Sequence, residues 1–289
     1  MVAYGFWWPC VMSTSHERTK VVSRFKGKVV AVTGSARGIG KNIVSSFARE
    51  GGLVVVCDIN SENGNATVKN LQKQGLSAEF LHVNLSENGA PQAMIQEIVT
   101  NHGRLDVLVN NARARSHSGT SMDDEKSWDS EIAVTLRAAY FATQEAIYVM
   151  ARHCGGSIVN ISSINAILES RSVTPIYHIA KAGLTQLTRS FAVRAGSNGV
   201  RVNALLPGFI LQDEHVSRYE RNDNQRYREL VEFCHPMGQP GRSDNIADAV
   251  LFLCSPEATF ISGQCLAIDG ASSVQEQFDL LLQFASDKS

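Results

Sequence analysis

Tyr177 and Lys181 have the residue types and the spacing needed to move a proton. If this segment is helical, positions i and i+4 share one face, so the Lys181 ammonium lies beside the Tyr177 phenol. A free phenol has a pKa of about 10, and a neighbouring cation favours the phenolate and lowers that pKa. Such a phenol can exchange a proton with a substrate oxygen. Ser163, earlier in the chain, offers a hydroxyl that can hold the same oxygen.

The residues upstream indicate a dinucleotide-binding turn, which gives the tyrosine–lysine pair its significance. The apolar run Val29–Thr33 is typical of a buried strand, and the glycine-rich segment Gly34–Gly40 leads from it into a helical pattern. Glycine lets the backbone approach a pyrophosphate, and the following helix N-terminus offers N–H groups to that anion. A second apolar run ends in Asp58, at about the distance where such sites bind a ribose 2′-hydroxyl. A tight strand–helix junction and an ordinary strand-end acid are the alternatives, and the register of the two features favours the ribose interpretation.

Further motifs follow in an order that resembles one known family, the short-chain dehydrogenase/reductases. The similarity extends from about Phe25 to about Ser273. Several independent motifs in the right order are more specific than any one of them. They are Thr33–Gly40, Asn110–Ala112, the residues Ser163, Tyr177 and Lys181, the pair Pro207–Gly208, and the C-terminal segments Gly241–Ser243, Val250–Leu253 and Ile261–Gly270.

The resemblance implies a role for each matching residue. In the family a tyrosine donates or accepts the proton, a lysine lowers its pKa and contacts the nicotinamide ribose, and a serine positions the substrate oxygen. These residues are Tyr177, Lys181 and Ser163 here. Asn84 stands where the family usually has an aspartate near adenine, and Ile210 would contact the nicotinamide carboxamide through its backbone. The resemblance implies no metal ion, and it implies cofactor contacts from Gly34, Arg37, Gly38, Ile39, Gly40, Asp58, Asn84, Leu85, Asn111, Ala112, Tyr177, Lys181, Pro207, Gly208 and Ile210.

Three positions depart from the family pattern. Arg113 replaces a glycine, Thr135 replaces the fourth catalytic residue, an asparagine, and Gln212 replaces a frequent threonine. In the family the asparagine is thought to hold a water in a proton relay, largely through its main-chain carbonyl. Thr135 can keep that carbonyl, so we expect activity to survive, with either a lower rate or an altered proton path.

Composition excludes several classes of protein. The 289 residues carry a formal net charge of -1, which gives no electrostatic footprint for nucleic acid. Hydrophobic residues make up 44%, yet no apolar run approaches the roughly 20 residues of a membrane span. Six cysteines show no C-x-x-C pair and no zinc spacing. We therefore expect free thiols and a cytoplasmic protein.

Apolar strands alternate with helical patterns along most of the chain. This pattern predicts a single Rossmann-like, doubly wound α/β domain at residues 25–273, with a parallel sheet of about seven strands and helices on both faces. Ligands of such sheets bind beyond the carboxyl ends of the strands, where Asp58, Asn111, Ser163 and Pro207 all fall. The predicted strands are Val29–Thr33, Leu53–Asp58, Ala78–Asn84, Leu105–Asn110, Ser157–Ser162, Val200–Leu206 and Gln264–Ile268, and the predicted helices include Pro91–His102, Trp128–His153, Tyr177–Ser197 and Ser243–Cys254.

Four segments lie outside this alternation. Residues 1–24 are expected to be a mobile extension or the product of an upstream start codon, with a membrane or partner contact through Trp7 and Trp8 as the alternative. Residues 113–127 are polar, and we expect them to form a loop at the mouth of the site. Residues 209–240 follow Pro207–Gly208, where the resemblance implies a substrate lid. Their mixed acids and bases are also typical of a solvated charged helix, and both interpretations can hold. The tail, residues 274–289, looks too apolar to hang free, and we expect it to cover either a neighbouring subunit's lid or its own core.

Together these features predict an NAD(H)-dependent oxidoreductase that interconverts a secondary alcohol and a ketone. Asp58 would repel a 2′-phosphate, which favours NAD over NADP, and Arg37 is a mild contrary signal. The polar loop and lid favour a small polar substrate of the sugar, polyol or hydroxy acid type. Arg113 is a candidate anion clamp, since a guanidinium pairs with carboxylates in two-pronged geometry; it could equally turn outward or bind the cofactor pyrophosphate.

Two other functions stay open at this point. One is a cofactor-binding protein with weak or no catalysis, such as a sensor or scaffold, and the other is a reductase of acyl or imine substrates. The intact set of Ser163, Tyr177 and Lys181 argues against the first, because a binding protein needs no tuned phenol. By resemblance we expect a homodimer or homotetramer that pairs through the long helices flanking the sheet.

Overall fold

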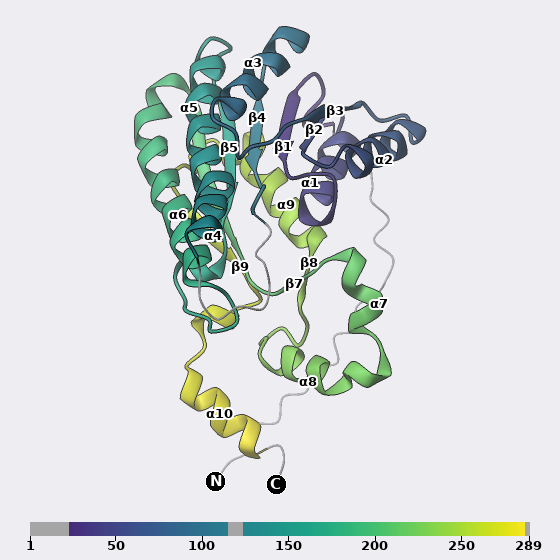
Figure 1. Cartoon of the computed structure of the whole chain (residues 1–289), viewed down its shortest axis with the longest axis vertical. Coiled ribbons are helices and arrows are strands. Elements are labelled where there is room, and N and C mark those ends of the chain that lie inside the picture. Colours follow the sequence, from purple (N-terminus) through teal and green to yellow (C-terminus); the bar gives the residue numbers. More distant parts are fainter. Residues whose placement is uncertain (1–22, 115–123, 287–289) are drawn as a thin grey trace.

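The computed structural model describes residues 23–114 and 124–286 (Figure 1). Residues 1–22 of the predicted extension, most of the predicted loop at 113–127, and the last three residues of the tail lie outside these ranges. Within residues 23–114 and 124–286, no helix is both long enough and apolar enough to cross a membrane.

Seven parallel strands form one sheet in the order β3-β2-β1-β4-β5-β6-β9, as the alternation of the sequence predicts. The order reverses between β1 and β4, and a crevice beyond the strand ends is expected at such a reversal. Two predicted boundaries were wrong by two residues: β3 ends at His82 and β4 begins at Val107. Both ends of β5, the end of β6 and the start of β9 differ from the prediction by one residue. The strands are β1 Val29–Thr33, β2 Leu53–Asp58, β3 Ala78–His82, β4 Val107–Asn110, β5 Gly156–Ile161, β6 Val200–Pro207 and β9 Cys265–Ile268.

Helices cover both faces of the sheet, in keeping with strands that are apolar on both sides. One face packs against α3, α5 and α6, and the other packs against α1, α2 and α9 (Figure 1). The helices are α1 Gly38–Arg49, α2 Ser61–Lys73, α3 Ala90–His102, α4 Glu125–Glu131, α5 Ala138–Ala151, α6 Pro175–Ala195, α7 Val216–Tyr219, α8 Gln225–Phe233, α9 Ser243–Cys254 and α10 Gln277–Ser286.

The predicted single helix Trp128–His153 is divided into three consecutive helical segments. It begins earlier, at Glu125, because the Asp124 carboxylate caps the helix and accepts a hydrogen bond from the Ser127 N–H at 2.7 Å. The predicted loop at 113–127 therefore ends at Asp124. Between α4 and α5, the segment Ile132–Arg137 is a π-helix, a widened turn that is frequent at functional sites.

The predicted lid, residues 209–240, contains α7 and α8 and is joined to the sheet domain by a short pair of strands (Figure 1). β7 Ile210–Leu211 pairs in parallel with β8 Gly241–Arg242, so the chain leaves and returns at one point. A pair of two-residue strands is too short to show a period-2 pattern, which is why the sequence did not indicate it.

The tail does not cover the core of its own chain, so this one of the two expected alternatives was wrong; coverage of a neighbouring subunit's lid stays a prediction. Its helix α10 stands clear of the sheet beside the lid (Figure 1). Phe284 lies 5.1 Å from Phe233 of α8 between ring centroids, and the Gln275 amide donates to the Cys234 carbonyl at 2.9 Å. Phe278 and Leu281 remain 66% and 65% exposed. The tail thus contacts its own lid and leaves an apolar face open.

Candidate active site

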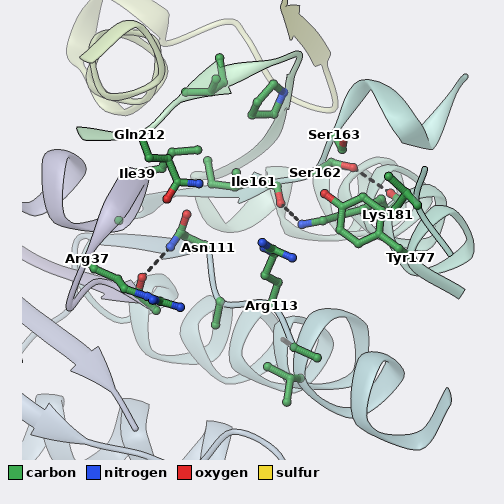
Figure 2. Close-up of a pocket in the computed structure, with 18 of the residues that line it drawn as sticks. Arg37, Ile39, Asn111, Arg113, Ile161, Ser162, Ser163, Tyr177, Lys181 and Gln212 are labelled. Carbon is green, nitrogen blue, oxygen red and sulfur yellow. Dashed lines mark hydrogen bonds between the residues drawn. The ribbon is translucent and has the colours of Figure 1, made fainter. Parts of the chain in front are cut away.

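A cavity of about 1550 Å³ opens beyond the carboxyl ends of the strands (Figure 2). Among the predicted residues, Gly38 and Thr135 do not line it: Gly38 faces the Gln212 side chain of the lid, and Thr135 is buried behind the wall. The predicted residues that line it are Gly34, Arg37, Ile39, Gly40, Asp58, Asn84, Leu85, Asn111, Ala112, Ser163, Tyr177, Lys181, Pro207, Gly208 and Ile210.

The glycine turn after β1 forms a backbone cradle at one end of the cavity. A Cβ at Gly40 would lie 2.4 Å from the Gly34 carbonyl oxygen, so only glycine permits this close turn into α1. The end of β4 is tied to the same turn, because the Asn111 side-chain amide donates to the Gly34 carbonyl at 2.9 Å and the Asn111 and Ala112 N–H groups donate to the Thr33 hydroxyl. The helix N-terminus beyond the turn can bind an anion such as a pyrophosphate.

Asp58 ends β2 beside this cradle, with its carboxylate held in place by the backbone. One oxygen accepts from the Ala36 N–H at 3.0 Å and the other from the Asn60 N–H at 2.9 Å. Each oxygen retains a second lone pair for a ligand. The cradle and this carboxylate together fit a dinucleotide with a free ribose hydroxyl. The Asn84 amide oxygen accepts from the Ser86 backbone and hydroxyl, and one N–H of the amide donates to Glu87. A second N–H remains for the predicted adenine contact.

Tyr177, Lys181 and Ser163 meet at the other end of the cavity (Figure 2). Tyr177 and Lys181 lie on one face of α6, with the Lys181 Nζ 5.6 Å from the Tyr177 ring centroid, as their spacing predicted. Ser163 follows β5 and forms a hydrogen bond with the phenol. This arrangement can hold a substrate oxygen between a hydroxyl and a phenol and move a proton at that oxygen.

Burial controls the protonation of this pair. It raises the pKa of Tyr177, against the lowering effects of the Ser163 hydrogen bond and the Arg113 charge. Burial also lowers the pKa of Lys181 to about 7. The Lys181 ammonium donates to the Ile161 carbonyl at 2.7 Å instead of to the phenol. The expected lowering of the Tyr177 pKa is therefore outweighed, because desolvation disfavours the charged form of both groups.

Thr135 is joined to a carboxylate that was not among the predicted site residues. Its hydroxyl donates to Glu131 Oε1 at 2.5 Å and accepts from the Ala114 N–H at 3.3 Å. Glu131 is only 5% exposed. An acid four residues before Thr135 shares its helix face, and that spacing is the signal that could have revealed it.

Arg113 projects into the cavity between Asn111 and Lys181, so the outward orientation is excluded (Figure 2). A polar wall that was not predicted is formed by Glu169, Ser170, Arg171 and Ser172, which lie between Ser163 and Tyr177 in the chain. His178 fixes this loop: its Nε2 accepts from the Ser170 N–H at 3.1 Å, and its Nδ1 lies 2.9 Å from the Thr174 carbonyl. The sequence signal that could have indicated this wall is its position in the chain between Ser163 and Tyr177.

The described residues contain no group of three or more metal-ligating side chains. Besides the polar wall, the catalytic end of the cavity presents the hydroxyl of Ser163, the phenol of Tyr177, the ammonium of Lys181 and the guanidinium of Arg113.

Comparisons with known proteins agree with this site. A sequence profile for the family described as Enoyl-(Acyl carrier protein) reductase matches residues 34–272. The chain is 33% identical over 247 residues to the 3-oxoacyl-[acyl-carrier-protein] reductase FabG of Thermotoga maritima, covering 86% of this chain and 98% of that protein. It is 35% identical over 251 residues to the probable galactose dehydrogenase GalD of Rhizobium meliloti, covering 83% and 93%. The crystal structure of a putative short-chain alcohol dehydrogenase from Sinorhizobium meliloti superposes with a TM-score of 0.80 at 29% identity, covering 88% and 100%.

Proposed function

Because the chain belongs to the short-chain dehydrogenase/reductase family of oxidoreductases, we propose that it interconverts a secondary alcohol and a ketone on a small polar substrate with NAD(H). The observation that carries this proposal is the meeting of Ser163, Tyr177 and Lys181 in one cavity with the glycine cradle and Asp58. A protein that only bound a dinucleotide would need the cradle and not the phenol.

In the proposed reaction, bound nicotinamide supplies a hydride acceptor for oxidation or a hydride donor for reduction. Ser163 holds the substrate oxygen by hydrogen bonding. Tyr177 accepts the hydroxyl proton in oxidation and returns it in reduction. The Lys181 ammonium, when charged, favours the phenolate form of Tyr177.

The family uses NAD(P)(H), and two residues bear on the choice between the cofactors. The Asp58 carboxylate can accept a hydrogen bond from a ribose 2′-hydroxyl and would repel a 2′-phosphate. Arg37, on the same wall, would favour the phosphate. We favour NAD, because Asp58 is fixed by two backbone hydrogen bonds and is therefore preorganised for the hydroxyl.

The lining of the cavity supports a polar substrate. Arg113 and the loop from Glu169 to Ser172 bring charges and hydrogen-bonding groups to the catalytic end, and Gln212 and Glu214 of the lid line the cavity beside the glycine turn. The similarity to a probable galactose dehydrogenase points in the same direction. Arg113 remains the candidate clamp for a carboxylate or phosphate on the substrate.

A reductase of acyl substrates is the second candidate. The similarity to 3-oxoacyl-[acyl-carrier-protein] reductases favours it, since the match covers nearly the whole length of these relatives. The same three catalytic residues could serve either reaction, so the choice between them depends on the substrate.

The experiment that tests the proposal follows the formation of NADH or NADPH from NAD or NADP, and their consumption in the reductive direction, by the wild type and Tyr177→Phe. The substrates are sugars, polyols, hydroxy acids and steroids, followed by 3-oxoacyl compounds with NADH and NADPH. Loss of the acid–base group should lower kcat by roughly 100-fold or more. Tyr227→Phe, on the lid, is the matched control and should retain activity. Turnover of acyl compounds alone would favour the second candidate, and NAD binding without any turnover would favour a sensor or scaffold.

A further inference from the structure

Glu131 is a buried carboxylate that the proposed mechanism does not use. It lies at the end of α4, is 5% exposed, and forms no ion pair with any lysine, arginine or histidine that the structure describes. Its carboxylate accepts a hydrogen bond from the Thr135 hydroxyl, at 2.5 Å. Burying a carboxylate without a cation is costly. Its presence beside the catalytic pair therefore calls for a functional explanation.

The packing brings Glu131 close to the catalytic helix. The π-helical segment lies so tightly against α6 that a Cβ at Gly183 would be 2.7 Å from Leu136 Cδ2. Gly183 is two residues beyond Lys181, and Leu136 directly follows Thr135. Both α4 and the π-helical segment pack against α6. The Glu131 carboxylate, held by Thr135, is close enough for its charge to act on Tyr177 and Lys181.

Arg113 supplies the opposite charge from the other side. It enters the cavity next to Lys181, one residue before Ala114, whose N–H donates to Thr135 (Figure 2). One chain of hydrogen bonds therefore links the arginine loop, Thr135 and Glu131. The charges of Glu131 and Arg113 therefore both act on the phenol and the ammonium.

We propose that Glu131 and Arg113 act as opposing charges that set the pH range in which Tyr177 and Lys181 work. Glu131 is a positioning residue in this scheme, because it acts through the catalytic pair and is held by Thr135. The inference rests on the proposed function, since it assumes that Tyr177 and Lys181 carry out the reaction.

The direction of each effect follows from electrostatics. A nearby negative charge raises the proton affinity of any group, and a positive charge lowers it. Glu131 accordingly raises the pKa of both Tyr177 and Lys181, while Arg113 lowers the pKa of both. Burial brings the pKa of Lys181 down to about 7 even with Glu131 present. Without the carboxylate, Lys181 would lose its proton at a lower pH.

Other charged groups around the cavity lie at its ends. Arg37 and Asp58 stand at the cofactor end, Glu169 and Arg171 on the loop before α6, and Glu214 and His215 on the lid. The pKa values of Tyr177 and Lys181 respond to Arg113 and Glu131. These two are therefore the residues to change.

The first test is the pH profile of kcat at saturating concentrations of a neutral substrate. Oxidation needs Tyr177 deprotonated and Lys181 protonated, so the profile should be bell-shaped. Glu131→Gln should move both limbs to lower pH, giving a faster enzyme than the wild type on the acidic limb and a slower one on the alkaline limb. Arg113→Gln should move both limbs to higher pH, and the double variant should return towards the wild type.

Two variants separate a charge effect from a structural one. Glu131→Asp keeps the charge and should restore the wild-type profile at least in part. Glu125→Gln makes the same change on an exposed turn of the same helix, where solvent and salt screen the charge, and should leave the profile unchanged. Profiles that do not move, or that move in the same direction for Glu131→Gln and Arg113→Gln, would overturn the proposal.

A second measurement does not depend on turnover. In the full-length protein labelled with ¹³C at tyrosine Cζ, the Tyr177 signal is the one that disappears in Tyr177→Phe. Its titration midpoint should fall in Glu131→Gln and rise in Arg113→Gln, and an unchanged midpoint in both would overturn the proposal. If the wild type turned over no substrate while these shifts appeared, the proposed reaction would fail and the opposing charges would stand. Because Arg113 is exposed, its variant keeps the test valid if Glu131→Gln does not fold.

Discussion

Asp58 is the residue on which the proposed cofactor preference depends. Asp58→Asn preserves the shape and one acceptor for the backbone while it removes the charge. Since a hydrogen bond to a charged group contributes roughly 1.5–3 kcal/mol, we expect NAD affinity to fall by about 10- to 100-fold. NADP affinity should rise, because the repulsion of the 2′-phosphate is lost and Arg37 remains. Calorimetric Kd values for both cofactors test this expectation.

The neighbouring acid Glu62 provides a control for general charge effects. Glu62→Gln changes an exposed carboxylate on α2 and should leave both Kd values within error. A wild type that bound NADP more tightly than NAD would contradict our assignment of Asp58.

Which site residues the sequence could reveal depends on how local their signals are. Asp58, Ser163 and Pro207 sit at strand ends, so an apolar run followed by a functional residue was enough to place them at the cavity. Glu131 follows no strand and has only its spacing of four residues from Thr135 as a signal; its burial is a property of the folded chain. The direction of the Tyr177 pKa was missed for the same reason: desolvation is a property of the folded chain.

At the scale of elements, the turn before β5 depends on one glycine. Gly155 has φ +103°, and a Cβ there would lie 2.2 Å from the Gly199 carbonyl oxygen in the turn before β6. The Gly199 oxygen belongs to the backbone, so neither the turn before β5 nor the turn before β6 can move aside without shifting one of these strands. Gly155→Ala should lower the free energy of unfolding by about 2–4 kcal/mol, combining left-handed strain with overpacking.

Gly75→Ala isolates the strain from the collision. Gly75 has φ +75°, and a Cβ there would meet nothing within 4 Å, so the cost should be only about 1–2 kcal/mol. Urea unfolding measures the free energy of unfolding of Gly155→Ala and of Gly75→Ala, and an unchanged m-value shows that the two values can be compared. Equal losses of unfolding free energy in the two variants would show that the close contact between the turns before β5 and β6 adds nothing to the cost of Gly155→Ala.

The elements themselves were predictable to different degrees. β1 and β2 were predicted correctly at both ends, because their apolar β-branched runs are bounded by a helix turn, a glycine or an acid. The start of α4 was missed although Asp124 is a typical N-cap. The π-helical widening at Ile132–Arg137 has no sequence period that separates it from an α-helix. The apolar residues of α10 predicted that the tail would be covered, whereas one apolar face of this helix is exposed in the single chain.

At the scale of the whole molecule, two separate surfaces carry exposed apolar side chains. Tyr148 of α5 and Val193 of α6 form part of the first, on the long helices that flank the sheet. Phe260 and Leu266, next to and within the edge strand β9, form part of the second. Exposed apolar patches of this kind mark interaction sites. We propose that the chain forms a homo-oligomer, a dimer if one surface pairs and a tetramer if both do.

Val193→Glu tests the surface formed by the long helices. Val193 is 84% exposed in the single chain, so a glutamate there is harmless to the monomer fold. In a symmetric interface the substitution brings two like charges together in a desolvated contact, which destabilises association. We expect the mass measured by light scattering to fall to half that of the wild type. Met237→Glu makes the same change, from an exposed apolar side chain to a carboxylate, on the lid and should leave the mass unchanged. A wild type that is monomeric at micromolar concentration would exclude pairing through either surface. An oligomeric wild type with a Val193→Glu variant of unchanged mass would exclude pairing through these helices and leave the β9 edge as the interface.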